Sequence, residues 1–396
     1  MYQIELAFEQ VYKNITWKRK AMLAQTPPMG WNSWNTFGND ISAQLVMDTA
    51  DYFVASGLKD AGYEYIVIDD LWEADERIDG RLSWDTSKFP NGIKPVADYV
   101  HSKGLKFGIY SCAGSHTCAG KPASYGYEEI DALTFAEWGV DFLKYDFCYA
   151  PPGVDGPTLY KRMGQALRAS GRPILFSICE WGKHKPWEWG AKAGGQMWRT
   201  TGDINDSWES ILDIGFRRQV GREAFAGPGR WNDPDMLVVG MYGKGNVAHG
   251  GCNDAEYRSH FTLWCLLASP LMIGCDVRSM NQATRDTLLN REAIAVNQDP
   301  LGRQGYFVGD NDHGGEFSSV WAKPLDDGSI AVGIFNLGDR PARLAVVGWE
   351  SLGLHDQRPC LVRDLWAHHD LGVHTSNYTA TVARHDVVLL KLTPVK

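Results

Sequence analysis

The chain has few cysteines, no long apolar runs and no excess of positive charge. Eight cysteines in 396 residues form no Cys-x-x-Cys pair, which argues against a zinc ribbon. No segment reaches the roughly 18 consecutive apolar residues of a membrane-spanning helix. Lys and Arg number 39 against 48 Asp and Glu, a balance ill-suited to holding a phosphate backbone. We therefore expect neither a membrane nor a nucleic acid among the partners of this protein.

The N-terminus also lacks the pattern of a signal peptide. Glu5 and Glu9 precede the only basic cluster, Lys18-Arg19-Lys20, and no apolar segment follows that cluster. A cytoplasmic location is the simplest prediction, with a secreted form left open. Residues 1–23 are expected to be an N-terminal extension outside the folded domains.

The composition is otherwise that of a globular protein, with 44% hydrophobic and 22% charged residues. Tryptophan is abundant, at 16 residues. So many indole rings indicate either a hydrophobic core rich in large aromatic side chains or surfaces that stack on flat apolar faces. Sugars have such faces.

Short apolar runs recur along the first three quarters of the chain, and each leads at once to polar residues. The runs begin near residues 29, 66, 107, 142, 174, 197, 231 and 271, with helical patterns between them. Strands that alternate with helices predict a parallel sheet. Because polar residues follow every strand rather than meeting at one crevice, we expect a closed (β/α)8 barrel and not a doubly wound sheet.

The pattern changes from about Gly302. Short β-type runs separated by turn residues indicate an antiparallel β-sandwich. We predict that the barrel spans residues 24–304 and the sandwich residues 305–396. The chemistry of such barrels lies on their own top face, so the sandwich is expected to stabilise rather than to catalyse.

Acidic residues follow the expected strands. They are Asp69, Asp70, Asp146, Glu180, Asp203, Asp233 and Asp235. A single acid at a strand end is commonly structural, but so many at one barrel mouth are harder to explain this way, because buried like charges cost stability. Two carboxylates about 5–5.5 Å apart are what a retaining glycosidase needs. Nearby lie further groups able to bind hydroxyls or stack on a sugar ring: Trp34, Tyr110, Lys144 and Arg199.

A metal site is the rival interpretation of an acidic barrel mouth. Such a site would usually bring histidines to the strand ends, and only His116 and His184 fall near them. We therefore expect no catalytic metal and no cofactor. A nucleophilic serine in a Gly-x-Ser-x-Gly turn is absent from the sequence as well.

Several long motifs, in order, closely resemble those of glycoside hydrolase family 27 α-galactosidases. They are Pro28-Met29-Gly30-Trp31-Asn32-Ser33-Trp34, Ile68-Asp69-Asp70, Leu143-Lys144-Tyr145-Asp146, Cys179-Glu180-Trp181, Trp198-Arg199-Thr200-Thr201-Gly202-Asp203 and Trp231-Asn232-Asp233-Pro234-Asp235-Met236. The resemblance implies a (β/α)8 barrel followed by a β-sandwich, in agreement with the pattern above.

The resemblance also implies roles for individual residues. Asp146 corresponds to the nucleophile and Asp203 to the acid/base, and an ionised Asp146 is expected to raise the pKa of Asp203. Asp69 and Asp70 would bind the 6- and 4-hydroxyls of the sugar. The other implied substrate-binding residues are Trp34, Tyr110, Lys144, Cys179, Glu180, Trp181, Arg199 and Asp235.

The sequence departs from the family at one of two disulfides. Many relatives have a cysteine directly after the tandem acids, bonded to another near the first strand, whereas this chain has Leu71 there and no cysteine around Gly38. The second bridge corresponds to Cys118 and Cys148, whose oxidation state the sequence leaves open. The remaining cysteines outside the motifs are expected to be buried thiols: Cys112, Cys252, Cys265, Cys275 and Cys360.

The implied activity is that of a retaining exo-glycosidase acting on terminal, non-reducing α-D-galactose. Both tandem acids and the bulky Cys179-Glu180-Trp181 wall favour galactose over the β-L-arabinopyranoside and α-N-acetylgalactosaminide substrates of other members. A non-catalytic sugar-binding protein is the alternative from another class, although it would be expected to have lost Asp146 or Asp203. The natural aglycone stays open, and so does assembly into a homo-oligomer.

Overall fold

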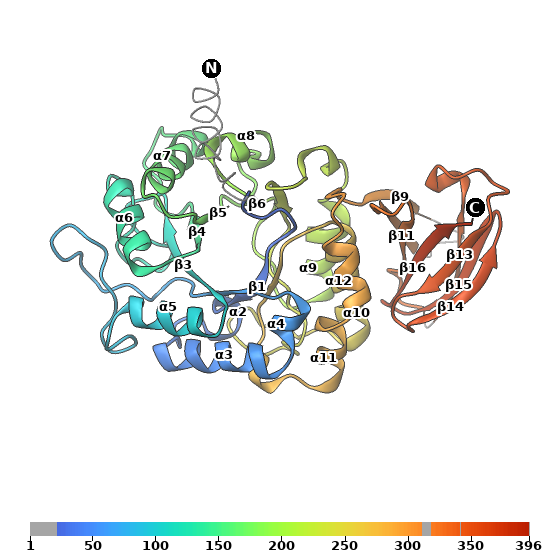
Figure 1. Ribbon diagram of the computed structural model, residues 1–396, viewed down its shortest axis with the longest axis horizontal. Coiled ribbons are helices and arrows are strands. Elements are labelled where there is room, and N and C mark those ends of the chain that lie inside the picture. The colour runs from blue at the N-terminus through green and yellow to red at the C-terminus, as the bar shows by residue number, and fades with distance from the viewer. Residues whose placement is uncertain (1–21, 311–317, 341, 396) are drawn as a thin grey trace, which may run out of the picture.

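The computed structural model describes residues 22–310, 318–340 and 342–395. Its first part is a parallel barrel surrounded by helices (Figure 1). The strands are β1 (Met29–Asn32), β2 (Tyr65–Val67), β3 (Lys106–Cys112), β4 (Phe142–Asp146), β5 (Leu175–Ile178), β6 (Met197–Arg199), β7 (Trp231–Asp233) and β8 (Leu271–Ile273). They pair in the order β7-β6-β5-β4-β3-β2-β1-β8. A parallel bridge between Leu237 and Ile273 joins the two ends of this sheet and closes the barrel.

Helices connect the barrel strands and cover their outer faces. They are α2 (Trp34–Phe37), α3 (Ala43–Ala55), α4 (Leu58–Ala61), α5 (Ile93–Ser102), α6 (Glu128–Trp138), α7 (Gly156–Ala169), α8 (Pro186–Ala193), α9 (Trp208–Ile211), α10 (Asp254–Leu266), α11 (Gln282–Leu288) and α12 (Arg291–Asn297). The hydroxyl of Ser42 accepts the N–H of Leu45 and so caps the start of α3. No helix in the described part of the chain is both long enough and apolar enough to cross a membrane.

The C-terminal part is antiparallel, as predicted. Its strands are β9 (Tyr306–Asp310), β10 (Ser318–Pro324), β11 (Ile330–Asn336), β12 (Ala342–Gly348), β13 (Cys360–Asp364), β14 (His369–His374), β15 (Asn377–Ala383) and β16 (Val387–Pro394). One sheet has the order β14-β13-β16-β11-β10-β9, and β12 pairs with β15 in the other. The sheets enclose an apolar cluster that includes Val332, Trp349 and Leu390.

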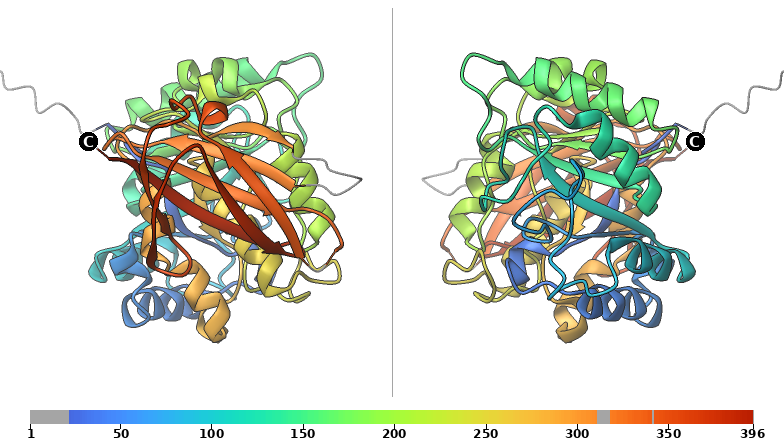
Figure 2. Two further views of the ribbon diagram at one scale, coloured as in Figure 1. Left: turned by 90° about the vertical axis from the view of Figure 1, so that its right-hand side faces the viewer. Right: turned by 90° about the vertical axis from the view of Figure 1, so that its left-hand side faces the viewer.

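The sandwich lies against one side of the barrel, with α10 between them (Figures 1 and 2). Arg258 on α10 forms a two-point ion pair with Asp386, with contacts of 3.0 and 2.6 Å. The hydroxyl of the next residue, Ser259, donates to the carbonyl of His385 at 2.7 Å. These contacts fix the sandwich on the side of the barrel, away from the open ends of the strands.

Candidate active site

A pocket lies at the carboxyl ends of the barrel strands. Its lining consists of Trp34, Asn35, Asp69, Asp70, Tyr110, Cys118, Lys144, Asp146, Trp181, Arg199, Asp203, Ile204, Asp235, Met236 and Val247. Every predicted catalytic and substrate-binding residue except Cys179 and Glu180 therefore faces this pocket. The barrel brings these residues together because the carboxyl ends of parallel strands share one face.

Asp146, the last residue of β4, is buried at the base of the pocket. One of its oxygens accepts the N–H of Phe147 at 2.9 Å, and the other accepts the hydroxyl of Tyr110 at 3.3 Å. Burial raises the pKa of Asp146 to about 6, although the nearby Lys144 ammonium favours the ionised form. Each oxygen accepts one of these hydrogen bonds and keeps a further lone pair available for chemistry.

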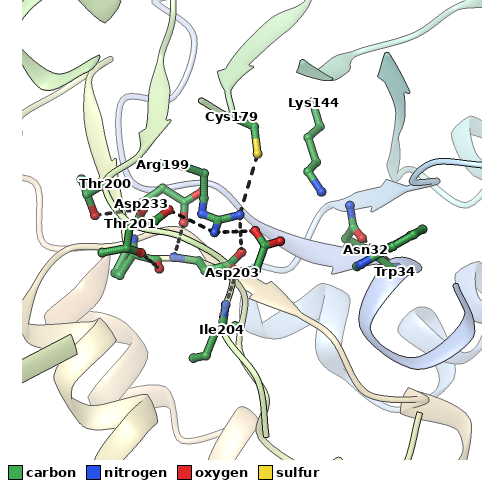
Figure 3. A network of polar contacts seen from close by, with 12 residues as sticks. Asn32, Trp34, Lys144, Cys179, Arg199, Thr200, Thr201, Asp203, Ile204 and Asp233 are labelled. Atoms are coloured by element: carbon green, nitrogen blue, oxygen red, sulfur yellow. Dashed lines mark hydrogen bonds and ion pairs between the residues drawn. The ribbon is translucent and has the colours of Figure 1, made fainter. Parts of the chain in front are cut away.

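Asp203 lies across the pocket in the loop after β6, and its side chain is 71% exposed. Arg199 donates to its Oδ1 at 2.9 Å (Figure 3). Burial of the site favours the neutral acid, but Arg199 and Lys144 outweigh it and hold the pKa of Asp203 below its ordinary value. The expectation of a raised pKa for Asp203 is therefore wrong, because the Arg199 guanidinium acts on this carboxyl more strongly than Asp146 does.

Arg199 is the centre of the polar network on this side of the pocket (Figure 3). Besides Asp203, its guanidinium contacts Asp235 at 3.0 Å and the sulfur of Cys179 at 3.8 Å. The other oxygen of Asp235 accepts the N–H of Ile204 at 2.8 Å. Asp233 lies behind, outside the pocket lining, and burial raises its pKa to about 7.

On the opposite side, Asp69 pairs with Lys144. The ammonium lies 2.8 Å from Oδ2 of Asp69, and the amide of Asn32 donates to the same oxygen at 2.6 Å. Asn32 ends β1, and no role was expected for it. Its place in the motif ending at Trp34 is the only signal in the sequence that could have indicated one.

Asp70 is held by backbone groups. Its Oδ1 accepts the N–H of Leu71 at 2.7 Å, and its Oδ2 accepts the N–H of Ala119 at 2.9 Å. Burial raises the pKa of this carboxyl. These two N–H groups belong to different loops, so the geometry of both loops determines where Asp70 points.

The disulfide implied by the family resemblance is present between Cys118 and Cys148. Its sulfurs and a carboxylate oxygen of Asp146 lie within 4.8 Å of one another. The two loops approach closely because Gly114 has no side chain, since a Cβ there would lie 2.1 Å from the carbonyl oxygen of Cys148. The bridge thus ties the loop that contacts Asp70 to the end of β4. The five cysteines predicted to be buried thiols are free and buried, and so is Cys179.

Cys179 and Glu180 lie behind the pocket wall and are almost wholly buried. Glu180 accepts the backbone N–H of His184 at 2.7 Å and contacts its imidazole at 3.0 Å. This partner was missed because His184 lies four residues further on, in a loop without strand or helix periodicity. Direct substrate contacts of Cys179 and Glu180 stay predictions.

The pocket thus presents carboxylate acceptors, cationic donors and aromatic rings around one small volume, with two carboxylates from opposite sides. Such a set suits a polyhydroxylated ligand.

A family model described as α-galactosidase A matches residues 26–299, and one described as the α-galactosidase C-terminal β-sandwich domain matches residues 316–392. The chain belongs to the α-galactosidase family. The predicted family, fold and glycoside hydrolase class are confirmed.

Individual members of the α-galactosidase family align over nearly the whole chain. The α-galactosidase of Cyamopsis tetragonoloba is 46% identical over 94% of this chain and 87% of its own length. The solved structure of α-galactosidase I from Mortierella vinacea has a TM-score of 0.86 at 38% identity, covering 95% of this chain and 98% of that one. A β-L-arabinopyranosidase from Geobacillus stearothermophilus has a TM-score of 0.84 at 28% identity, covering 94% and 97% of the two chains.

Proposed function

We propose that this protein is a retaining exo-α-galactosidase, which releases terminal, non-reducing α-D-galactose from oligosaccharides and galactosides. Its strongest support is the convergence of Asp146 and Asp203 on one pocket, whose other walls come from strands β1 to β7 and the loops after them. A pocket enclosed on so many sides admits one terminal sugar and not the middle of a chain.

The reaction would proceed by two displacements. Asp146 attacks the anomeric carbon while Asp203 donates a proton to the departing glycosidic oxygen, which gives a galactosyl ester of Asp146. Asp203, now ionised, takes a proton from water as the water oxygen attacks the same carbon and the ester bond breaks. Two inversions leave the α configuration unchanged. The carboxylates supply both nucleophile and acid, so the chemistry requires no Lewis acid.

Galactose is favoured by the distribution of donors and acceptors. Asp69 and Asp70 offer acceptors for the 4- and 6-hydroxyls, and Lys144 offers a donor between the tandem acids and Asp146. Arg199 would serve the side of the 2-hydroxyl. Trp34, Tyr110 and Trp181 supply apolar surface for the sugar ring.

The alternatives within the family differ at two positions of the sugar. An α-N-acetylgalactosaminide needs room beside its 2-position, where Trp181 and the buried Cys179–Arg199 contact leave little. A β-L-arabinopyranoside lacks the hydroxymethyl group, so it would leave an acceptor of the tandem acids unused. The relatives of higher identity are also α-galactosidases, as the Cyamopsis enzyme is.

A panel of nitrophenyl glycosides tests this assignment. We expect the α-galactoside to be hydrolysed much faster than the α-N-acetylgalactosaminide and the β-L-arabinopyranoside. Proton NMR of the first sugar formed should show the α anomer before mutarotation, and dialysis against EDTA should leave the rate unchanged. Faster turnover of the arabinopyranoside would contradict the substrate, and β-galactose as the first product would contradict retention.

A further inference from the structure

Lys88 lies outside the pocket lining and joins two segments that border it. Its Nζ donates to the side-chain oxygen of Asn39 at 2.7 Å and to the backbone carbonyl of Leu71 at 2.8 Å. The side chain of Lys88 is half-buried. Lys88 thereby connects Asn39, in the loop between α2 and α3, to Leu71, which directly follows the tandem acids.

Leu71 has a backbone conformation that needs such support. Its φ is +75°, in the left-handed region. For a residue with a side chain this conformation is strained, and it persists only where surrounding contacts impose it. The Lys88 ammonium is the contact that holds the Leu71 carbonyl, so we attribute the retention of this conformation in part to Lys88.

The conformation of Leu71 in turn determines where Asp70 points. The N–H of Leu71 donates to Oδ1 of Asp70 at 2.7 Å. Relaxation of Leu71 to a negative φ would rotate the peptide planes beside its Cα, and the N–H would then leave the carboxylate. Only the N–H of Ala119, at 2.9 Å, would still orient Asp70 from the backbone.

We propose that Lys88 is a positioning residue for Asp70, acting through the Leu71 peptide to hold the carboxylate toward the sugar hydroxyls. This inference rests on the proposed function, because it takes Asp70 to bind the substrate. The side chain of Lys88 can be changed without loss of its backbone contact. The Lys88 carbonyl accepts the N–H of Ala43 at the start of α3, and a side-chain substitution leaves that hydrogen bond in place.

Substitution of Lys88 in two backgrounds tests the inference. Lys88→Met removes the ammonium and keeps the aliphatic chain, whereas Lys88→Arg keeps a charged donor. Lys59→Met is the matched control, since the Nζ of Lys59 likewise donates to a backbone carbonyl, that of Lys103 at 2.6 Å. Lys59 and Lys103 precede β2 and β3, whereas the tandem acids follow β2, so this contact lies at the other end of the strands. Each variant is assayed on nitrophenyl α-galactoside in the wild type and in Asp70→Asn, and its thermal midpoint is measured.

In the wild-type background we expect Lys88→Met to lower kcat/KM by roughly tenfold, as the loss of one hydrogen bond to a charged group does. Lys88→Arg should recover most of that loss, and Lys59→Met should cause none. In the Asp70→Asn background Lys88→Met should have almost no further effect, because residues that act as one unit are not additive.

An equal loss in both backgrounds would overturn the inference, since Lys88 would then act on the barrel and not on Asp70. So would an undiminished kcat/KM in Lys88→Met, or an equal loss in Lys59→Met. A wild-type protein that does not hydrolyse the α-galactoside contradicts the proposed function instead. The same cycle is then run on whichever glycoside of the panel the protein hydrolyses.

Discussion

Arg199 holds Asp203 in a 2.9 Å ion pair, although the Asp203 side chain is 71% exposed. Across the pocket, Asp146 is buried and its pKa is raised to about 6. Because these two pKa shifts have opposite directions, a single proton shared by the two acids resides on Asp146. Catalysis needs that proton on Asp203 and an ionised Asp146, so the reactive state is a minor form of the singly protonated pair.

The pH dependence of kcat/KM should reflect this shared proton. As pH rises through about 6 the pair loses its proton, Asp203 can no longer act as acid, and kcat/KM should fall. As pH falls through the depressed pKa of Asp203 both acids become protonated, the nucleophile is lost, and kcat/KM should fall again. Rates on nitrophenyl α-galactoside across the pH range check this, and a basic limb far above pH 7 would contradict it.

Residue types at strand ends made most of the pocket predictable from the sequence. A parallel barrel brings every strand end to one face, so Asp69, Asp146 and Arg199 could be assigned to a common site without coordinates. Which of Asp146 and Asp203 has the higher pKa could not be predicted from the sequence. It depends on the distance and exposure of Arg199, Lys144 and both acids, which spacing along the chain does not give.

The strands of the sandwich were likewise only partly predictable from the sequence. The apolar runs that became β10, β11 and β13 predicted the sandwich, but β14 and β15 gave no signal. The residues of β14, His369–His374, are mostly exposed and include two histidines and a glycine. Pairing with β13 holds this edge strand in place, and such pairing is invisible in local composition.

Reduction of the Cys118–Cys148 disulfide should lower activity. The bridge holds the loop whose Ala119 N–H orients Asp70, and Cys118 is exposed, so dithiothreitol can reach it. We expect kcat/KM on nitrophenyl α-galactoside to fall by roughly tenfold and to recover on reoxidation. The doubly substituted Cys118→Ser, Cys148→Ser protein should have the kcat/KM of the reduced enzyme, and dithiothreitol should not change it. Loss of activity of that variant in dithiothreitol would mean that the reductant acts by some route other than this disulfide.

The Arg258–Asp386 ion pair should stabilise the docking of the sandwich on the barrel. Arg258→Met leaves the largely buried Asp386 carboxylate without its two-point partner, at a cost of about 1–2 kcal/mol. Calorimetry should show a lower midpoint of thermal unfolding. Arg384→Met is the control, because its partner Asp339 is 85% exposed and such pairs contribute little. Equal shifts of the unfolding midpoint in both variants would mean that the interdomain ion pair stabilises the protein no more than an exposed pair does.

Asp146→Asn and Asp203→Asn should differ in their dependence on the leaving group. Without Asp146 no galactosyl ester can form, so turnover should be lost on every substrate. Without Asp203 the proton donor is missing, and alkyl galactosides should slow by roughly 10²–10⁴-fold. Dinitrophenyl galactoside should form the ester at a rate much closer to that of the wild type, because its leaving group departs without a proton. Burst kinetics on the two substrates measure this difference.

Azide provides the decisive control for the Asp203 assignment. In Asp203→Asn the galactosyl ester would accumulate, because no base activates water, and azide attacks it without base help. Turnover should recover, with α-galactosyl azide as the product. Azide should not rescue Asp146→Asn in this way, since no ester precedes its attack. If Asp203→Asn loses activity equally on all leaving groups and forms no azide adduct, Asp203 only binds substrate. The acid must then be sought at Asp235, because Glu180 and Asp233 lie outside the pocket lining.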